Sequence, residues 1–215
     1  MIERLVPESV AVVSTRGDLP DVELFAEEER SVGRAVEKRR REFTTARGCA
    51  RMALERLGVA PVAIPNGERG EPVWPGGIVG SITHCTGYRA SAVARVEDVL
   101  SVGIDAEVHE RLPEGVLEQI AFGTELATVA GDGGGVCLDR LMFSAKEAVY
   151  KAWFPLARRW LGFEDVEMTI DVPVSSFRAR LLVPGPVVGG VRLTEFRGRW
   201  AVEDGIVAAA VVVLP

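Results

Sequence analysis

The sequence contains few cysteines and histidines, and their spacing excludes several kinds of protein. Three of the 215 residues are cysteine, Cys49, Cys85 and Cys137, and an odd number of widely separated cysteines cannot form a complete set of disulfides. The two histidines, His84 and His109, have no cysteine pair beside them, which argues against a structural zinc site. We therefore expect free thiols in a reducing compartment.

Long hydrophobic runs are also lacking. The N-terminal segment meets Glu3 and Arg4 at once and has no apolar stretch long enough for an export signal. The apolar run Ile206–Leu214 has nine residues, far fewer than the roughly 20 that span a membrane as a helix. We expect a buried strand there, and a cytoplasmic protein without a membrane partner.

An excess of positive charge is absent as well. The chain has 25 Lys and Arg against 31 Asp and Glu, a net charge of −6, which disfavours a protein that coats nucleic acid with its whole surface. Any anion-binding site must therefore be local. With 47% hydrophobic and 26% charged residues, the composition is that of a soluble globular protein with a real core.

The pattern of elements predicts two α+β halves, which we place at residues 1–100 and 101–215. In the first half, small and apolar residues at helical spacing predict a helix over 27–57, with Thr44 or Thr45 as a cap and Gly58 at its end. A second helix over 139–154 is expected to stop or kink at Pro155. The predicted strands are 78–85, 89–96, 100–108, 166–172, 177–183, 191–202 and 206–214.

The strand 100–107 brings two carboxylates together. Its alternation places Gly103, Asp105 and Glu107 on one face. Carboxylates this close repel each other unless a cation lies between them, and hard oxygen ligands suit Mg²⁺. The alternative is a solvent-facing strand with ordinary charges.

The segment FSAKEAVYKAW, residues 143–153, adds a third carboxylate. Glu147 and Lys151 are four residues apart on one helix face, and Lys146 lies beside them. Such a pair is often only a surface ion pair, but the aromatic residues around it leave little room for a solvated face. The pair is therefore a candidate for a cleft that faces phosphates.

Basic residues gather within 14 positions of the first predicted helix: Lys38, Arg39, Arg40, Arg41, Arg47 and Arg51. Arginine forks match phosphate oxygens, so part of this cluster is a candidate anion site, although a solvated helix face is the alternative.

The segment GSITHC, residues 80–85, delivers Thr83 and His84 near the end of a strand. No G-x-S-x-G elbow supports a serine hydrolase, and the glycines of 131–135 lack both Walker and Rossmann spacing.

These pieces, in this order, resemble the 4′-phosphopantetheinyl transferase superfamily, specifically its longer, pseudo-dimeric Sfp type. VGIDAE (102–107) resembles the family's G-I-D-x-E motif, FSAKEAVYKAW resembles F-S-x-K-E-x-x-Y-K, and GSITHC resembles its S-x-x-H strand. RREFTTAR (40–47), GEPVWP (70–75) and GRWAVEDG (198–205) further resemble actinobacterial members, so that the resemblance extends from about residue 39 to residue 205.

The resemblance implies two similar α+β halves related by a pseudo-twofold axis, with coenzyme A between them. It implies a cytoplasmic, monomeric enzyme that moves the phosphopantetheine arm of coenzyme A onto a serine of apo acyl or peptidyl carrier proteins, in fatty-acid, polyketide or nonribosomal peptide synthesis. Adenosine 3′,5′-bisphosphate would be released. Neither nucleic acid nor a membrane is expected as a partner.

The resemblance also assigns roles to residues. Asp105, Glu107 and Glu147 would bind Mg²⁺, with Mn²⁺ as the alternative metal. Glu147 would accept the serine proton, and Lys151 is the rival for that catalytic role. The coenzyme A ligands implied are Arg39, Arg47, Arg69, Thr83, His84, Lys146 and Lys151.

Two positions depart from the family pattern. Its G-K-P motif reads Gly70-Glu71-Pro72 here, so Arg69 would replace the missing lysine. The middle of the D-x-E motif is Ala106, which has no ligand atom, so water would fill that coordination position.

Two other functions fit parts of the same pattern. One is a nucleotide pyrophosphatase or another phosphotransferase that uses the same three carboxylates without a carrier protein. The other is a non-catalytic subunit that binds coenzyme A or a carrier protein. The joint presence of Asp105, Glu107, Glu147 and Lys151 argues against a pure binding protein, which has little use for a complete metal site.

Overall fold

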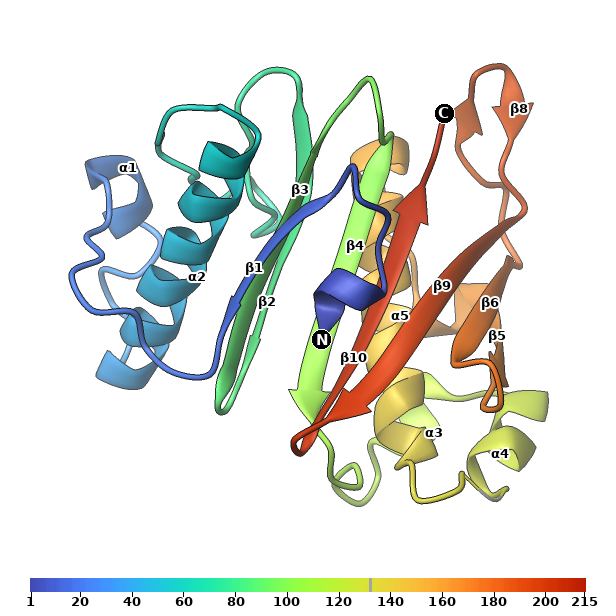
Figure 1. Ribbon diagram of the computed structural model, residues 1–215. Coiled ribbons are helices and arrows are strands. Elements are labelled where there is room, and N and C mark those ends of the chain that lie inside the picture. The colour runs from blue at the N-terminus through green and yellow to red at the C-terminus, as the bar shows by residue number, and fades with distance from the viewer. Residues whose placement is uncertain (132) are drawn as a thin grey trace.

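The computed structural model describes residues 1–131 and 133–215, so that residue 132, within the predicted glycine-rich loop, lies outside them. The described part contains two larger antiparallel sheets and a small hairpin (Figure 1). The first sheet has the order β1-β3-β2 and consists of β1 (Ala11–Thr15), β2 (Ile78–Cys85) and β3 (Tyr88–Arg95). The second has the order β4-β10-β9-β6-β5 and consists of β4 (Ser101–Val108), β5 (Val166–Asp171), β6 (Ser176–Leu181), β9 (Glu195–Glu203) and β10 (Ile206–Val213). The hairpin joins β7 (Val187–Val188) to β8 (Val191–Arg192).

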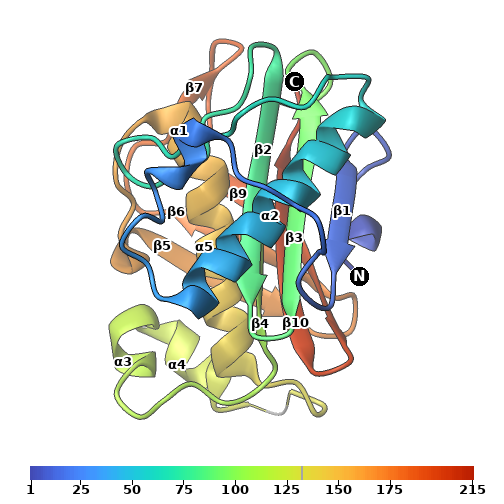
Figure 2. The same cartoon turned by 90° about the vertical axis from the view of Figure 1, so that its left-hand side faces the viewer.

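Each larger sheet carries one long helix. Helix α2 (Glu37–Arg56) covers the first sheet, and α5 (Leu138–Ala157) packs along β4 and β10 (Figures 1 and 2). The shorter helical segments are η1 (Ile2–Arg4), α1 (Ala26–Glu29), α3 (Leu117–Ile120), α4 (Thr124–Val129) and η2 (Phe163–Asp165). This arrangement confirms the predicted α+β class.

Across the described ranges, no helix is both long enough and apolar enough to cross a membrane.

Among residues 1–131 and 133–215, three hydrophobic cores hold the layers together. Strand alternation decides which residue joins which core. One core lies between α2 and the first sheet, one between the two sheets, and one between the second sheet and α5. In β4, Val102, Ile104 and Ala106 belong to the core between the sheets. The alternation correctly predicted that these three residues share one face of β4. The opposite face points to α5.

The two sheets meet at their edge strands β2 and β4, through side chains. The Ser81 hydroxyl oxygen accepts a hydrogen bond from the Ile104 N–H at 3.0 Å, and the Thr83 hydroxyl accepts one from the Ala106 N–H at 3.0 Å. These bonds satisfy edge N–H groups that would otherwise lack a partner in the interior. The division of the chain into domains at residue 100 stays a prediction.

The predicted helix over 27–57 is wrong in its first part. The chain forms the single-turn helix α1, leaves helical geometry, and restarts at Glu37. Thr44 is not a cap: it lies inside α2, where its hydroxyl donates to the Arg40 carbonyl at 2.9 Å. Gly58 ends the helix as predicted, with a φ of +72° that suits glycine.

Two further differences concern short features. The α5 helix continues past Pro155 to Ala157 and ends at Arg158 in left-handed geometry, because a proline so close to the end removes little helical bonding. Strand β1 was not predicted from its five residues, and it is held by antiparallel pairing with β3.

Candidate active site

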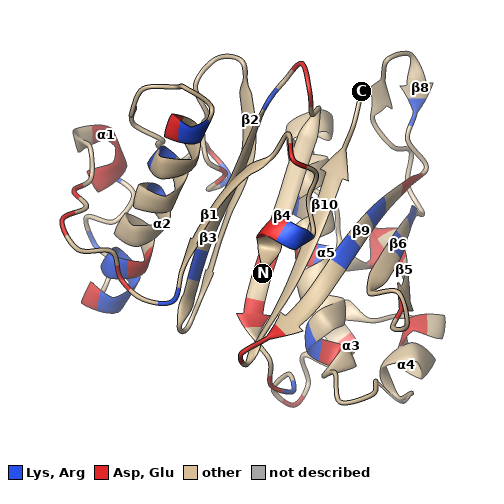
Figure 3. Ribbon diagram, in the orientation of Figure 1, with Lys and Arg blue, Asp and Glu red and all other residues tan. Residues whose placement is uncertain are grey.

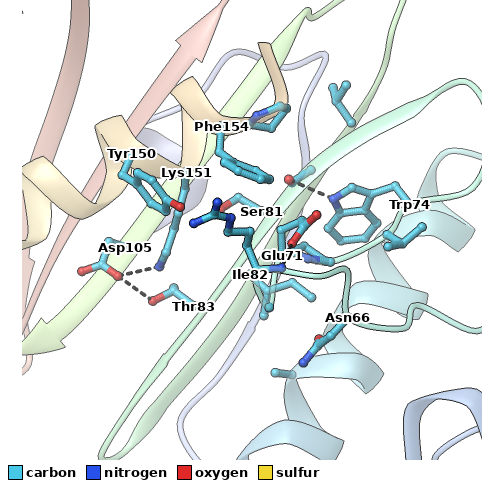
Figure 4. Close-up of a pocket in the computed structure, with 18 of the residues that line it drawn as sticks. Asn66, Glu71, Trp74, Ser81, Ile82, Thr83, Asp105, Tyr150, Lys151 and Phe154 are labelled. Carbon is cyan, nitrogen blue, oxygen red and sulfur yellow. Dashed lines mark hydrogen bonds and ion pairs between the residues drawn. The ribbon is translucent and has the colours of Figure 1, made fainter. Parts of the chain in front are cut away.

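A cavity of about 490 Å³ lies at the junction of the two sheets. It is lined by residues of α2, the 66–74 loop, β2, β4 and α5, so that both halves of the chain contribute. A pocket of this size, formed where two packed units meet, is a usual place for a small-molecule site. Figure 4 shows its lining side chains converging from these elements.

Asp105, on β4, is the centre of the carboxylate side. It is 5% exposed, and its Oδ1 accepts hydrogen bonds from Lys151 Nζ at 2.7 Å and from the Thr83 hydroxyl at 3.3 Å (Figure 4). Lys151 also donates to the Ile104 carbonyl at 3.1 Å. The second oxygen, Oδ2, is buried without a hydrogen-bond partner among the described residues. A buried carboxylate oxygen of this kind is suited to a further ligand such as a cation.

Gly103 explains why α5 approaches β4 so closely. A Cβ atom at Gly103 would lie 2.0 Å from the Ala148 carbonyl oxygen and 2.5 Å from the Ala152 nitrogen. The Ser101 hydroxyl fixes the same contact by donating to the Ala152 carbonyl at 2.7 Å. Only a glycine allows this approach, which brings the α5 side chains to Asp105.

Glu147 and Lys151, on α5, both line the cavity, as their helical spacing predicted. Burial raises the pKa of Glu147, the Lys151 ammonium lowers it, and the Asp105 carboxylate raises it. Burial, together with the nearby Asp105 charge, raises the pKa of Glu107 to about 7. Arg140 opposes this rise, since its Nη1 lies 3.5 Å from Glu107 Oε2. The Asp105 carboxylate is therefore close enough to disfavour the ionisation of both Glu107 and Glu147.

The charge of this cluster fits a cation, but its carboxylates do not surround a common point where one would bind. Crowded carboxylates and the unpartnered oxygen of Asp105 favour a divalent ion with oxygen ligands. Glu107 lies beside the cavity rather than in its lining. Over residues 1–131 and 133–215, no three His, Cys, Asp or Glu side chains are gathered tightly enough to hold a metal.

The opposite wall of the cavity is cationic, and its Arg47 side chain is held by contacts within the chain. Arg47 is 4% exposed, donates from Nε to the Ile64 carbonyl at 2.7 Å and from Nη2 to Asn66 Oδ1 at 2.5 Å, and stacks on Phe43. Burial lowers its pKa to about 10, so it remains a cation at neutral pH. These bonds fix the guanidinium before any ligand arrives.

His84 and two more arginines complete this wall. The guanidinium of Arg39 contacts the His84 ring, and Arg69 reaches the cavity from the 66–74 loop. Burial, then the charges of Arg39 and other cations, lowers the pKa of His84 to about 4. His84 is therefore neutral at pH 7, and it would meet an anion as a hydrogen-bonding group rather than as a cation.

Lys146 corrects the expectation that it binds the ligand. It is 3% exposed and lies outside the cavity lining, and its ammonium donates to Glu125 at 2.8 Å. The carbonyls of Ile120, Phe163 and Val166 accept from the same ammonium. With all these acceptors around it, Lys146 has no donor to offer a bound molecule.

Arg51 is likewise not at the cavity, although it shares a helix face with Arg47. It forms a buried ion pair with Glu28, a contact that its sequence neighbours could not indicate. In contrast, several lining residues were not predicted as site residues: Asn66, Glu71, Trp74, Tyr150, Phe154 and Arg158. The F-S-x-K-E-x-x-Y-K segment contains Tyr150, and Phe154 lies three residues beyond its end. Both follow Glu147 on later turns of the same helix, so helical spacing held a signal for them.

The 66–74 loop has internal bonds that shape the cavity entrance. The Glu71 carboxylate folds back over Gly67 and accepts from the Arg69 N–H at 3.0 Å. The Trp74 indole N–H donates to the Gly80 carbonyl at 2.9 Å, and its ring fills the space that a side chain at Gly80 would need (Figure 4). Glu71 therefore stabilises the loop through contacts within the loop itself.

Comparisons with known proteins give matches along nearly the whole chain. Residues 27–94 match the family described as 4′-phosphopantetheinyl transferase N-terminal domain, and residues 101–188 match the 4′-phosphopantetheinyl transferase superfamily. The chain is 49% identical to 4′-phosphopantetheinyl transferase Svp of Streptomyces mobaraensis over 219 residues, which cover 99% of this chain and 89% of Svp.

Two further relatives are similar to the chain over most of its length. Identity to 4′-phosphopantetheinyl transferase Npt of Nocardia iowensis is 47% over 219 residues, covering 98% of this chain and 99% of Npt. Identity to 4′-phosphopantetheinyl transferase PptT of Mycobacterium tuberculosis is 47% over 210 residues, covering 95% of this chain and 92% of PptT.

Proposed function

Since this chain belongs to the 4′-phosphopantetheinyl transferase superfamily and is an enzyme of that kind, we propose that it transfers the phosphopantetheine arm of coenzyme A to a serine of apo acyl or peptidyl carrier proteins. The observation that carries the proposal is the two-sided cavity. Arginines from one half line one wall of a cavity of about 490 Å³, and carboxylate and ammonium groups from the other half line the opposite wall.

The cationic wall supports binding of an anionic nucleotide. Arg39 and Arg47 would contact the phosphates of coenzyme A, with His84 as a neutral hydrogen-bonding partner and Arg69 at the entrance. Because Arg47 is already held by Ile64 and Asn66, little side-chain freedom is lost when it binds. This ordering favours tight recognition of a phosphate.

In the transfer, the serine oxygen of the carrier forms a bond to the β-phosphate of coenzyme A. The bond from that phosphorus to the leaving oxygen breaks, and adenosine 3′,5′-bisphosphate departs with the electron pair. Glu147 would accept the serine proton, and its burial, which raises its pKa, makes it a better base. Lys151 would contribute positive charge where the phosphoryl group is transferred.

Asp105, Glu107 and Glu147 are the residues that would hold Mg²⁺, although their side chains are not gathered around one point among the described residues. The unpartnered oxygen of Asp105 is the most direct support for this role. When bound, such an ion neutralises charge on the diphosphate and the leaving group. Thr83 holds Asp105 by a hydrogen bond at 3.3 Å, which supports a positioning role for its hydroxyl in addition to contact with the ligand.

The proposal is tested by intact-protein mass spectrometry of apo carrier proteins incubated with this enzyme, coenzyme A and Mg²⁺. We expect a mass gain of one phosphopantetheine arm that is lost with EDTA and with Glu147→Gln. Glu167→Gln, a surface variant in an ion pair with Arg180, is the control and should transfer normally. Cleavage of coenzyme A without a modified carrier would favour a pyrophosphatase instead, and binding without either product would favour a non-catalytic subunit.

A further inference from the structure

Each half of the chain buries one glutamate between a short helical turn and its long helix. Glu28 is fully buried in the first half, and Glu125 is 1% exposed in the second. Neither side chain lines the cavity described above. Both are the last residue of a Phe-x-x-Glu segment, Phe25 to Glu28 and Phe122 to Glu125.

In the first half, Glu28 ties together three parts of the chain. Its carboxylate accepts from the Phe25 N–H at 2.9 Å and from the Ile64 N–H at 2.9 Å. Arg51, on α2, donates to both carboxylate oxygens at 3.0 and 2.9 Å and lies over the Phe25 ring. Helix α1 lies beside α2 in Figure 1, where this contact is made.

In the second half, Glu125 makes the same set of contacts. Its carboxylate accepts from the Phe122 N–H at 2.8 Å and from the Met168 N–H at 2.7 Å. Lys146, on α5, donates to it at 2.8 Å and lies over the Phe122 ring. Glu28 with Arg51 and Glu125 with Lys146 are therefore equivalent ion pairs, which we call the two buried clamps.

Stability alone does not account for these clamps. Desolvation of two charges offsets much of their attraction, so a buried ion pair often adds little net stability compared with apolar residues of the same volume. What a fully hydrogen-bonded buried pair does provide is a fixed geometry, because any displacement leaves an unpaired charge in the interior.

The first clamp holds the segment that orders Arg47. Glu28 accepts from the N–H of Ile64, and Arg47 donates to the carbonyl of the same residue. A shift of Ile64 would therefore move a partner of Arg47 directly. Arg51 is one helical turn beyond Arg47 and fixes the rotation of α2 at that point.

The second clamp fixes the rotation of α5 at the residue preceding Glu147. Besides Glu125, the Lys146 ammonium contacts carbonyls at 120, 163 and 166, so segments on several sides hold it. Adjacent helix residues point about 100° apart, so holding Lys146 away from the cavity sets the direction of Glu147 toward it.

We propose that the two buried clamps are positioning devices with separate effects: Glu28 and Arg51 set the coenzyme A-binding arginine Arg47, and Glu125 and Lys146 set the proton acceptor Glu147. This inference rests on the proposed function. It assigns the lysine of the F-S-x-K-E segment to the scaffold rather than to the ligand.

The test is the separation of KM from kcat in carrier-protein modification, with thermal unfolding of every variant. We expect Lys146→Met to lower kcat by about 10- to 100-fold with little change of KM for coenzyme A. Lys146→Arg, which copies the cation of the first clamp, should restore most of kcat. Glu28→Gln should raise KM for coenzyme A by about 10-fold with kcat largely kept. Arg180→Met, which removes a surface ion pair, is the control.

Wild-type enzyme is assayed first, because its failure to modify any carrier would reject the proposed function and not the clamps. Given wild-type transfer, two results would overturn the inference. One is a folded Lys146→Met enzyme with wild-type kcat. The other is a lower kcat combined with a higher KM for coenzyme A in every variant, in proportion to the fall in Tm. If Lys146→Met does not fold, Glu125→Gln replaces it, because it removes the same ion pair. A lower kcat with the KM for coenzyme A largely kept supports the second clamp, and a wild-type kcat or a change confined to KM rejects it.

Discussion

Glu107 offers a direct measurement of the electrostatic crowding in the carboxylate cluster. Its pKa is raised from 4.5 to about 7, first by burial and then by Asp105. Folding therefore favours the protonated form of Glu107. Below pH 4.5 both the folded and the unfolded chain are protonated and no penalty exists; as the pH rises toward 7 the unfolded chain loses its proton first, and the penalty grows.

The size of the effect follows from the two pKa values. A difference of this size corresponds to roughly 3 kcal/mol once both states are ionised, at about 1.4 kcal/mol for each pKa unit. Glu107 retains 25% side-chain exposure, which weakens the effect somewhat. The unfolding free energy of Glu107→Gln relative to the wild type should therefore increase by about 2 kcal/mol as the pH rises from 5 to 8.

The assay is urea unfolding of both proteins in EDTA at several pH values. In EDTA the difference in unfolding free energy between variant and wild type should widen as the pH rises. Glu167→Gln is the control: it lies on the surface, where Arg180 lowers the pKa of Glu167, so its removal should not stabilise the protein at high pH. Parallel stability curves for wild type and Glu107→Gln would refute the crowding argument. With Mg²⁺ at pH 8, the wild type should recover stability and Glu107→Gln should recover less.

Three further predictions concern single positions. Asp105→Ala or Glu147→Ala should reduce carrier modification by at least about 100-fold with the fold kept, which circular dichroism and mass spectrometry would check; wild-type turnover in either would contradict the site. Arg47→Ala should weaken coenzyme A binding by about 10-fold or more in calorimetry while saturating turnover is largely kept; unchanged binding with a lower maximal rate would be the opposite result. Gly103→Ala should destabilise the protein by about 1–3 kcal/mol in urea unfolding and lower its activity, because its Cβ would meet the α5 backbone; a variant as stable as wild type would show that α5 can move aside.

Local sequence pattern was sufficient to predict where a side chain points when its direction follows from its own helix or strand. Alternation along β4 correctly placed Asp105 and Ile104 on opposite faces, and the four-residue spacing correctly placed Glu147 and Lys151 together. The strands from β2 to β4 and β10 were also predicted within a residue or two of their observed ends. These features depend on neighbours close in sequence.

Sequence pattern failed where the deciding contact comes from far along the chain. Lys146 is adjacent to Glu147 and was grouped with it, but Glu125 and backbone carbonyls draw it into the interior. Arg51 shares a helix face with Arg47, which made it a candidate for the same site, but its ion pair with Glu28 holds it away from the cavity. The break in the predicted first helix follows from this pair, because α1 must end to let Glu28 reach Arg51.

The charge pattern of the fold shows why the two halves are not interchangeable in function despite equivalent clamps. Basic ribbon lies along α2, and acidic ribbon lies at the carboxyl end of β4 (Figure 3). The clamps orient α2 and α5 in the same way, but the residues they present to the cavity differ: Arg39 and Arg47 on one side, Glu147 and Lys151 on the other. The proposed phosphate-binding wall and the proposed proton-accepting wall can face each other only if each helix is held in one rotation. A buried charge enforces that rotation more strictly than an apolar contact, because a rotated helix would leave the charge unpaired.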